Sequence, residues 1–318
     1  MVVLCTWRKT MARVWSAPEF EVPMKVSPMF KGSMTALVTP FKNGAVDEKA
    51  FAALVERQIA AGTHALVPAG TTGETPALTL EERLSVVELC IEVSGGRVPV
   101  IAGTGVNATA ASIQLQQHAK EKGADAGLVV APYYNKPSQA GILAHFTAIA
   151  DAVALPIFVY NIPGRSIVDI TPETMAEMAR HPNVIGVKDA TGDMSRVTRH
   201  RNLIGDAFIQ LSGDDATALG YNAHGGQGAI SVTSNVAPDL CARFQNACLD
   251  GRWDEARMLN DQLQPLHEAL FSAPSPGPSK YALSLLGLCE EEVRLPLVEC
   301  PDPVKQKVRA AMEGCGLL

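Results

Sequence analysis

The chain has 318 residues, of which 47% are hydrophobic and 19% are charged, and its formal net charge is −6 at pH 7. This composition can fill a hydrophobic core and excludes a disordered chain. The sequence has no run of basic residues, which argues against a surface for nucleic acid or an anionic membrane. A small anionic substrate remains compatible with it, because one arginine in a pocket is enough to bind a carboxylate.

The first 28 residues predict no globular element. Arg8, Lys9 and Arg13 interrupt the only hydrophobic stretch, so the segment lacks the apolar region of a secretory signal. Two glutamates weaken the alternative of a transit peptide, which the arginines and tryptophans leave open. We expect residues 1–28 to be a non-globular extension ahead of a domain that begins near Met29.

The seven cysteines are scattered and are never spaced as C-x-x-C, a pattern that indicates neither a disulfide framework nor a zinc site. No stretch of 18 apolar residues occurs, so we expect no membrane-spanning helix. Both observations favour a cytoplasmic protein.

Eight short apolar runs follow one another along the rest of the chain, each bounded by glycine, proline or polar residues. Each run is nearly continuous in apolar residues, which is typical of parallel strands covered on both faces. The predicted strands are residues 35–40, 65–70, 98–103, 126–132, 156–161, 184–190, 208–214 and 227–235.

Amphipathic stretches of helical length lie between these runs. One of them, residues 79–93, opens with the capping pattern T-L-E-E. The predicted helices are residues 47–61, 79–93, 109–122, 141–153 and 171–181. Strands that alternate with helices in this way predict an α/β fold, a (β/α)8 TIM barrel. A doubly wound open sheet is the alternative, because counting strands cannot distinguish a closed sheet from an open one.

We expect the barrel to occupy residues 29–251 and to carry the active site. Residues 252–318 then form a small C-terminal helical domain, with helices at 253–271 and 280–288. Three prolines in the segment between these two helices predict a rigid bend there.

Polar residues gather at the ends of six predicted strands, and in barrels of this kind catalytic groups lie at the carboxyl ends of strands. The segments are G-T-T-G-E at 70–74, P-Y-Y-N-K-P at 132–137, Y-N-I-P-G-R at 160–165, the strand end with Lys188, S-G-D-D at 212–215 and S-V-T-S-N at 231–235. Turn chemistry alone does not explain such a concentration.

Lys188 ends the apolar strand V-I-G-V-K-D. An inward-facing lysine is desolvated, which lowers its pKa, and the neutral amine can then attack a ketone to form a Schiff base. The alternative is a lysine that reaches out of the barrel mouth and pairs with Asp189 or Asp193.

A Schiff-base enzyme that forms carbon–carbon bonds also needs groups that transfer protons and bind anions. Tyr134 and Tyr160 supply phenols, and Thr71 and Thr72 supply hydroxyls. Arg165 offers a planar guanidinium suited to a carboxylate. The alternatives are simple packing for the tyrosines and a surface ion pair for the arginine. The seven histidines are isolated, and we expect neither a metal nor a cofactor.

The motifs G-T-T-G-E, P-Y-Y-N, Y-N-I-P-G-R, G-V-K-D-A-T and G-A-I-S-V-T, in this order, resemble those of the dihydrodipicolinate synthase family of pyruvate-dependent class I aldolases. The resemblance implies a lyase, without a cofactor, that condenses pyruvate with L-aspartate 4-semialdehyde to give 4-hydroxy-tetrahydrodipicolinate. This reaction is the first committed step of lysine and diaminopimelate biosynthesis. The resemblance also implies a homotetramer, a dimer of dimers.

The same resemblance implies a role for each site residue. Lys188 would form the Schiff base with pyruvate, and Tyr160 would transfer protons, linked through Thr71 to Tyr134 of a neighbouring subunit. Thr72 and the Ile230 backbone would bind the carboxylate of pyruvate. Arg165 would bind the carboxylate of L-aspartate 4-semialdehyde.

Two other functions stay open. A related lyase could act on a keto-sugar acid, as N-acetylneuraminate lyases do, but such enzymes would not place Arg165 at this motif. A non-catalytic barrel that binds a keto acid would have no use for a complete proton relay. In family members that lysine inhibits, histidines and a glutamate stand where this chain has Leu80, Arg83 and Ala111, which predicts weak or absent inhibition by lysine.

Overall fold

The computed structural model describes residues 30–318, so that the predicted extension of residues 1–28 lies outside the described residues. Eight parallel strands form one sheet in the order β4-β1-β10-β9-β8-β7-β6-β5. A parallel bridge between Leu66 and Val100 joins its two outer strands and closes the barrel. The strands are β1 (Gly32–Ala36), β4 (Ala65–Val67), β5 (Ile101–Gly103), β6 (Ala126–Val130), β7 (Ile157–Asn161), β8 (Val184–Asp189), β9 (Ile209–Ser212) and β10 (Gly228–Ser231). The predicted (β/α)8 barrel is confirmed.

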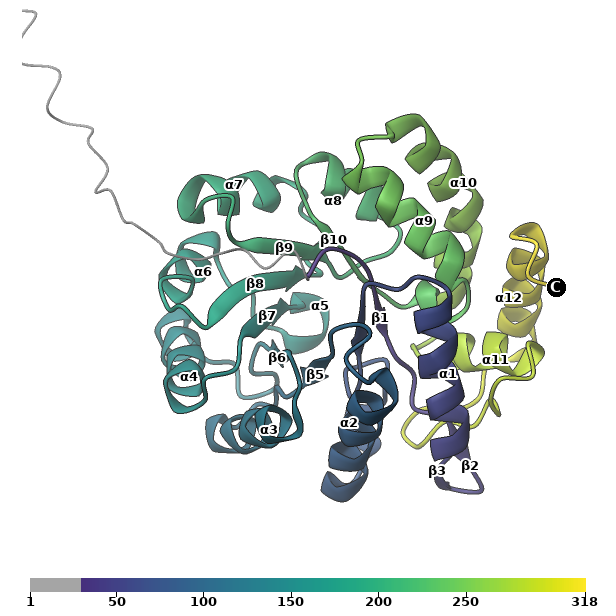
Figure 1. The fold of residues 1–318 in the computed structure, drawn as a ribbon, viewed down its shortest axis with the longest axis horizontal. Coiled ribbons are helices and arrows are strands. Elements are labelled where there is room, and N and C mark those ends of the chain that lie inside the picture. Colours follow the sequence, from purple (N-terminus) through teal and green to yellow (C-terminus); the bar gives the residue numbers. More distant parts are fainter. Residues whose placement is uncertain (1–29) are drawn as a thin grey trace, which may run out of the picture.

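Helices surround the barrel on its outer side (Figure 1). They are α1 (Glu48–Ala60), α2 (Leu80–Ser94), α3 (Thr109–Lys122), α4 (Gln139–Ala152), α6 (Pro172–Met178), α7 (Ser195–Ile204), α8 (Ala218–Ala223) and α9 (Pro238–Leu249). The short helix α5 (Pro163–Ser166) lies instead inside this ring, next to β7 (Figure 1). The Thr79 hydroxyl caps α2 and Glu82 bonds back to the Thr79 N–H, which confirms the predicted capping box. Among the described residues, no helix has both the length and the apolar character needed to cross a membrane.

The interior of the barrel is a packed core and not a pore. Met34, Phe158, Leu211 and Ile230 belong to one cluster of buried side chains contributed by different strands. Phe30 packs edge-to-face on Phe158, with ring centroids 5.2 Å apart.

The first strand lies earlier in the chain than the prediction of residues 35–40. The structure pairs Gly32–Ala36, and the apolar residues that follow are buried without belonging to a strand. Leu37 and Val38 are at most 1% exposed, and Val38 packs with Leu283 of the C-terminal region. Burial of a loop under later helices therefore produced an apolar run that resembles a strand. The short hairpin of β2 (Phe41–Lys42) and β3 (Ala45–Val46), which was not predicted, follows it.

The C-terminal region contains α10 (Trp253–Leu270), α11 (Gly277–Leu285) and α12 (Asp302–Gly314). The first two correspond to predicted helices, whereas α12 was missed although Val308, Ala311 and Met312 give it a buried face. These three helices share one core cluster with α9 of the barrel. The domain boundary at residue 251 stays a prediction.

Candidate active site

Lys188 lies near the carboxyl end of β8 and is 5% exposed. Its backbone pairs in register with Tyr160 on β7 and with Leu211 on β9. Gly213, just after β9, leaves room for the side chain, since a Cβ there would lie 3.2 Å from Lys188 Cε and 2.9 Å from Ala190 Cβ. The ammonium or amine is thus held against neighbouring strand ends and does not extend into solvent.

The alternative of an ion pair at the barrel mouth is not seen. The Asp189 carboxylate accepts a hydrogen bond from the Thr191 N–H at 2.9 Å. Asp193 accepts one from the Ser195 N–H at 2.9 Å and lies 3.9 Å from Arg196. Within residues 30–318, Lys188 forms no ion pair with a carboxylate inside 4.0 Å.

Burial lowers the pKa of the Lys188 amine from 10.5 to about 8. The negative charge of Asp215 opposes this shift, and the positive charge of Arg165 adds to it. Asp215 is itself held in place, because its Oδ2 accepts hydrogen bonds from the N–H groups of Val232 at 2.8 Å and Thr233 at 3.0 Å. With this pKa roughly a tenth of the Lys188 amine is neutral at pH 7, far more than for an exposed lysine, and the neutral form is the nucleophile.

Tyr160 stands beside the lysine on the neighbouring strand. Lys188 Nζ lies 4.4 Å from the centroid of the Tyr160 ring, and the tyrosine is 6% exposed. Burial raises the pKa of the phenol to about 12, while Arg165 and a hydrogen bond with the Thr71 side chain partly oppose that rise. The structure thus brings Lys188, Tyr160 and Thr71 together, three residues that the sequence proposed for one site.

Thr71 and Thr72 belong to a tight loop after β4. The Gly73 N–H donates to the Gly70 carbonyl and the Glu74 N–H to the Thr71 carbonyl, both at 3.1 Å. Thr72 is buried at 5% exposure. Backbone turns of this kind fix the two threonines relative to the strand end.

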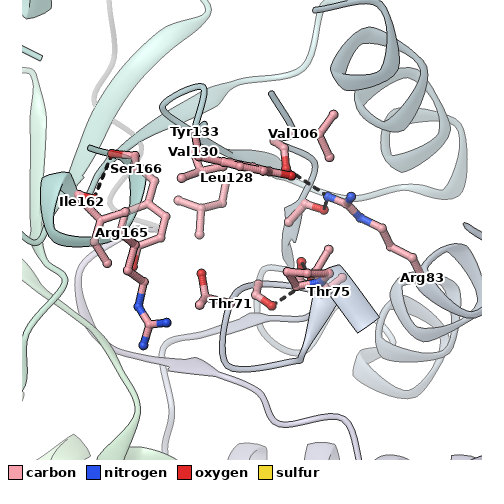
Figure 2. Close-up of a pocket in the computed structure, with 16 residues that line it drawn as sticks. Thr71, Thr75, Arg83, Val106, Leu128, Val130, Tyr133, Ile162, Arg165 and Ser166 are labelled. Atoms are coloured by element: carbon pink, nitrogen blue, oxygen red, sulfur yellow. Dashed lines mark hydrogen bonds between the residues drawn. The ribbon is translucent and has the colours of Figure 1, made fainter. Parts of the chain in front are cut away.

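A cavity of about 340 Å³ opens beside these residues. Thr71, Tyr160 and Arg165 line it together with Tyr133 and Arg83. Figure 2 shows Arg165 and Arg83 on opposite sides of it. A cavity of this size accommodates small carboxylic acids, and it presents a basic group at each end.

The two arginines are held differently. Arg165 lies on the short helix α5, is exposed and forms no ion pair with a carboxylate of residues 30–318, so the predicted alternative of a surface ion pair is not seen. Arg83 is 7% exposed and donates to the Gly103 carbonyl at 2.8 Å and the Gly105 carbonyl at 3.3 Å. Burial lowers the pKa of Arg83 to about 10.

The two remaining predicted site residues have different positions. Ile230 lies on β10, 1% exposed in the barrel interior, where it pairs with Met34 of β1. Tyr134 is 91% exposed, has a left-handed φ of 72° and does not line the cavity. Within one chain, the structure therefore does not bring Tyr134 to Thr71 and Tyr160.

Sequence reasoning missed Asp215 as a neighbour of the lysine charge. The S-G-D-D segment marked a polar strand end, but it did not distinguish Asp215 from Asp214. In the structure Asp214 caps its own turn, through Ala216 and Thr217, while Asp215 faces the strand ends. Among residues 30–318 no group of three or more His, Cys, Asp or Glu side chains is placed to share a metal ion.

Comparison with known proteins gives a consistent result. Residues 29–314 match the model of the Dihydrodipicolinate synthetase family. The chain is 61% identical, over 291 residues, to the 4-hydroxy-tetrahydrodipicolinate synthase of Hyphomonas neptunium, an alignment that covers 91% of this chain and 99% of that protein.

Solved structures agree with this. The crystal structure of dihydrodipicolinate synthase from Aquifex aeolicus has a TM-score of 0.89 and 43% identity, covering 91% of this chain and 99% of the other. The chloride-inhibited dihydrodipicolinate synthase of Acinetobacter baumannii, a complex with pyruvate, has a TM-score of 0.89 and 41% identity with the same coverage.

Proposed function

The chain belongs to the dihydrodipicolinate synthetase family, and we infer that it is a lyase that condenses pyruvate with L-aspartate 4-semialdehyde to give 4-hydroxy-tetrahydrodipicolinate, in lysine and diaminopimelate biosynthesis. The observation that carries the mechanism is Lys188, a buried amine with a pKa of about 8 at the carboxyl end of a barrel strand. The place in metabolism is that of the relatives, and we propose a cytoplasmic location for the enzyme.

In this proposal Lys188 is the nucleophile. Its neutral amine attacks the ketone carbon of pyruvate, and loss of water gives a protonated Schiff base. Loss of a proton from the methyl group then gives an enamine, whose carbon attacks the aldehyde of the second substrate, and the resulting alkoxide takes up a proton. The amino group of that substrate then attacks the imine carbon, which closes the ring and breaks the bond to Lys188, so that the lysine leaves as a free amine. Tyr160 is the group that transfers these protons, and the centroid of its ring lies 4.4 Å from Lys188 Nζ.

The two carboxylates bind at separate places. Thr72, in the loop after β4, and the Ile230 backbone, on β10, hold the carboxylate of pyruvate at the carboxyl ends of the strands, the same end of the barrel as Lys188. Arg165 holds the carboxylate of L-aspartate 4-semialdehyde, because its guanidinium lines the cavity and has no carboxylate partner among residues 30–318.

Assembly completes the proton relay. Tyr134 is almost fully exposed on a backbone held in the left-handed region, which is unfavourable for a tyrosine unless a neighbour stabilises it. We propose that Tyr134 enters the site of a neighbouring subunit and reaches Thr71 there, and that the enzyme is a homotetramer, a dimer of dimers.

The alternatives of a keto-sugar acid lyase and of a non-catalytic binder are less well supported. A neutral polyol aldehyde gives Arg165 no anion to bind. A binder needs neither an amine with a lowered pKa nor a tyrosine beside it. Assay of the purified enzyme with each aldehyde in turn separates the two lyase activities.

Borohydride reduction in the presence of pyruvate tests the proposal. A reduced pyruvyl adduct on Lys188, located by peptide mass mapping, is expected in the wild type and not in K188Q. Lys280, the other buried lysine described below, is an internal control that is expected to stay unmodified. Folded wild-type protein that forms no adduct would refute the Schiff-base mechanism and favour a keto-acid binder.

A further inference from the structure

Lys280 is a second buried lysine, on α11 of the C-terminal region, and the active-site chemistry does not use it. It is 0% exposed. Its Nζ lies 2.5 Å from Glu74 Oε1, donates to the Glu292 carbonyl at 2.8 Å and stands 3.9 Å from the centroid of the Phe41 ring. A carboxylate, a carbonyl and an aromatic ring therefore surround this ammonium.

Arg294 reaches the same glutamate from the other side. Its backbone N–H donates to Glu74 Oε2 at 3.0 Å, so each carboxylate oxygen of Glu74 has a partner from the C-terminal region. The Arg294 guanidinium bonds both oxygens of Glu82 at 2.6 Å and the Ala77 carbonyl at 3.1 Å. We call Lys280, Glu292 and Arg294 the C-terminal clamp.

Glu74 is the last residue of the G-T-T-G-E segment. Its own N–H donates to the Thr71 carbonyl at 3.1 Å, and its carbonyl accepts the Ala77 N–H at 2.8 Å. Its φ is +54°, in the left-handed region that non-glycine residues seldom adopt. A conformation of this kind persists only where the surroundings hold it, and here the clamp supplies those surroundings.

The other side of the loop is held less strongly. The Thr39 hydroxyl donates to the Gly73 carbonyl at 2.8 Å, and the Thr75 hydroxyl donates to the Ala69 and Gly70 carbonyls. These bonds are neutral. The contacts that Glu74 makes with Lys280 and with the Arg294 N–H involve a charge, and charge-assisted contacts in a buried setting are the stronger class.

We propose that Lys280 is a positioning residue for the condensation: acting through Glu74, it holds the loop that carries Thr71 and Thr72 in its reactive conformation. The inference rests on the proposed function, in which Thr71 contacts Tyr160 and Thr72 binds pyruvate. The C-terminal helices thereby determine the geometry of an active site that lies on the barrel.

The test replaces the buried pair by a neutral pair of similar size, K280M/E74Q, in the full-length enzyme. This avoids leaving one charge buried alone. Kinetic constants are expressed per folded active site, counted by the pyruvate trapped with borohydride at saturation. We expect kcat to fall about tenfold to a hundredfold, the effect of a misplaced catalytic group, together with a rise in KM for pyruvate.

The KM for aspartate semialdehyde separates positioning from a general structural defect. Arg165 lies on α5 and contacts neither Glu74 nor the clamp, so this KM is expected to stay unchanged. A merely structural role would lower the number of folded sites and leave kcat per site and both KM values at wild-type levels. That result overturns the proposal.

The matched control is K305M/E291Q. It removes the 2.7 Å ion pair between Lys305 on α12 and Glu291, in the same C-terminal region but without contact to the loop. Its kinetic constants are expected to be those of the wild type. Equal changes in the two double variants would contradict a specific effect of Lys280.

E74Q alone covers the case in which K280M/E74Q does not fold. It is isosteric and keeps an acceptor for the Arg294 N–H. Its amide nitrogen then faces the Lys280 ammonium, so the charge of residue 74 and the acceptor for Lys280 are both lost. The same split between the two KM values is expected, with wild-type constants overturning the proposal.

Trapping in the wild type distinguishes failure of the proposed function from failure of the positioning role. A wild type that forms no adduct refutes the proposed function, whereas a wild type that forms it, beside variants with unchanged constants, refutes the positioning role alone.

Discussion

The two buried lysines of residues 30–318 show what distinguishes a reactive amine from a structural one. Lys188 and Lys280 are both at most 5% exposed, and burial lowers the pKa of each. Lys188 lies near the end of a strand against Tyr160, which lines the cavity, and pairs with no carboxylate of residues 30–318. Lys280 lies 2.5 Å from Glu74, whose charge opposes the shift in its pKa.

Burial alone therefore does not make a nucleophile. A buried ammonium with a counterion 2.5 Å away stays charged and holds the chain together, as Lys280 holds the active-site loop. A buried amine without one becomes neutral more readily and, if a cavity gives substrates access, it can react. The comparison predicts opposite consequences for removing the two side chains.

The largest expected effect is on the rate. K188M removes the nucleophile and is expected to lower kcat by at least about 10⁴-fold, since the rest of the site cannot replace a covalent catalyst. K280M, measured per folded site, is expected to retain far more activity. Steady-state assays with both substrates compare them, and equal losses in the two variants would contradict the distinction.

Stability is expected to change in opposite directions. K280M leaves the Glu74 carboxylate buried without its partner, which is expected to destabilise the fold by about 3–5 kcal/mol. In K188M an uncompensated amine is removed, and the shift in its pKa from 10.5 to about 8 corresponds to a gain of up to about 3 kcal/mol at pH 7. Urea unfolding of both variants measures the two changes.

The gain in stability expected for K188M depends on pH, because the pKa of Lys188 is lowered in the folded state. Because the folded-state pKa of Lys188 is lowered, protonation of the native amine opposes folding below pH about 8, and this effect vanishes as the pH rises through 10.5. The stability advantage of K188M should therefore be present at pH 7 and shrink toward pH 10.5. An advantage that does not depend on pH would indicate repacking instead.

Smaller shifts are expected from the neighbours of Lys188. Asp215 raises and Arg165 lowers the pKa of the amine, so D215N should move the acidic limb of the rate of pyruvate trapping to lower pH and R165M should move it to higher pH. Shifts of about half a unit to one unit are expected for charges in a partly solvated site. Shifts of the same sign in the two variants would rule out this account.

The smallest expected effect concerns lysine as an effector. Arg83 stands at the far end of the cavity with a positive charge, and Leu80 and Ala111 add no carboxylate for an ammonium group. We expect less than about a twofold change in rate at millimolar lysine. The ammonium group of free lysine finds no carboxylate there, so lysine binds too weakly to shift the enzyme toward an inhibited state. Strong inhibition in a steady-state assay would show that another group receives the ammonium.

Much of the fold followed from local patterns. Continuous apolar runs marked all eight strands, because parallel strands in a barrel are buried on both faces. The first was displaced from residues 35–40 to Gly32–Ala36, since Leu37 and Val38 are apolar for a different reason. Leu37 is buried in the cluster that contains residues of α1 and α2, and Val38 packs with Leu283 of the C-terminal region. The helix α12 was not predicted, although Val308, Ala311 and Met312 give its sequence an apolar face.

The sequence by itself determined the class of fold, the family and the position of Lys188 at a strand end, because these depend on residues that are close together in the chain. Tertiary structure alone decided which charges face one another. Asp215 lies near Lys188 and Lys280 pairs with Glu74, 206 residues earlier in the chain, only because the folded chain brings distant segments together. Electrostatic coupling depends on distance in space and on burial, neither of which local patterns record.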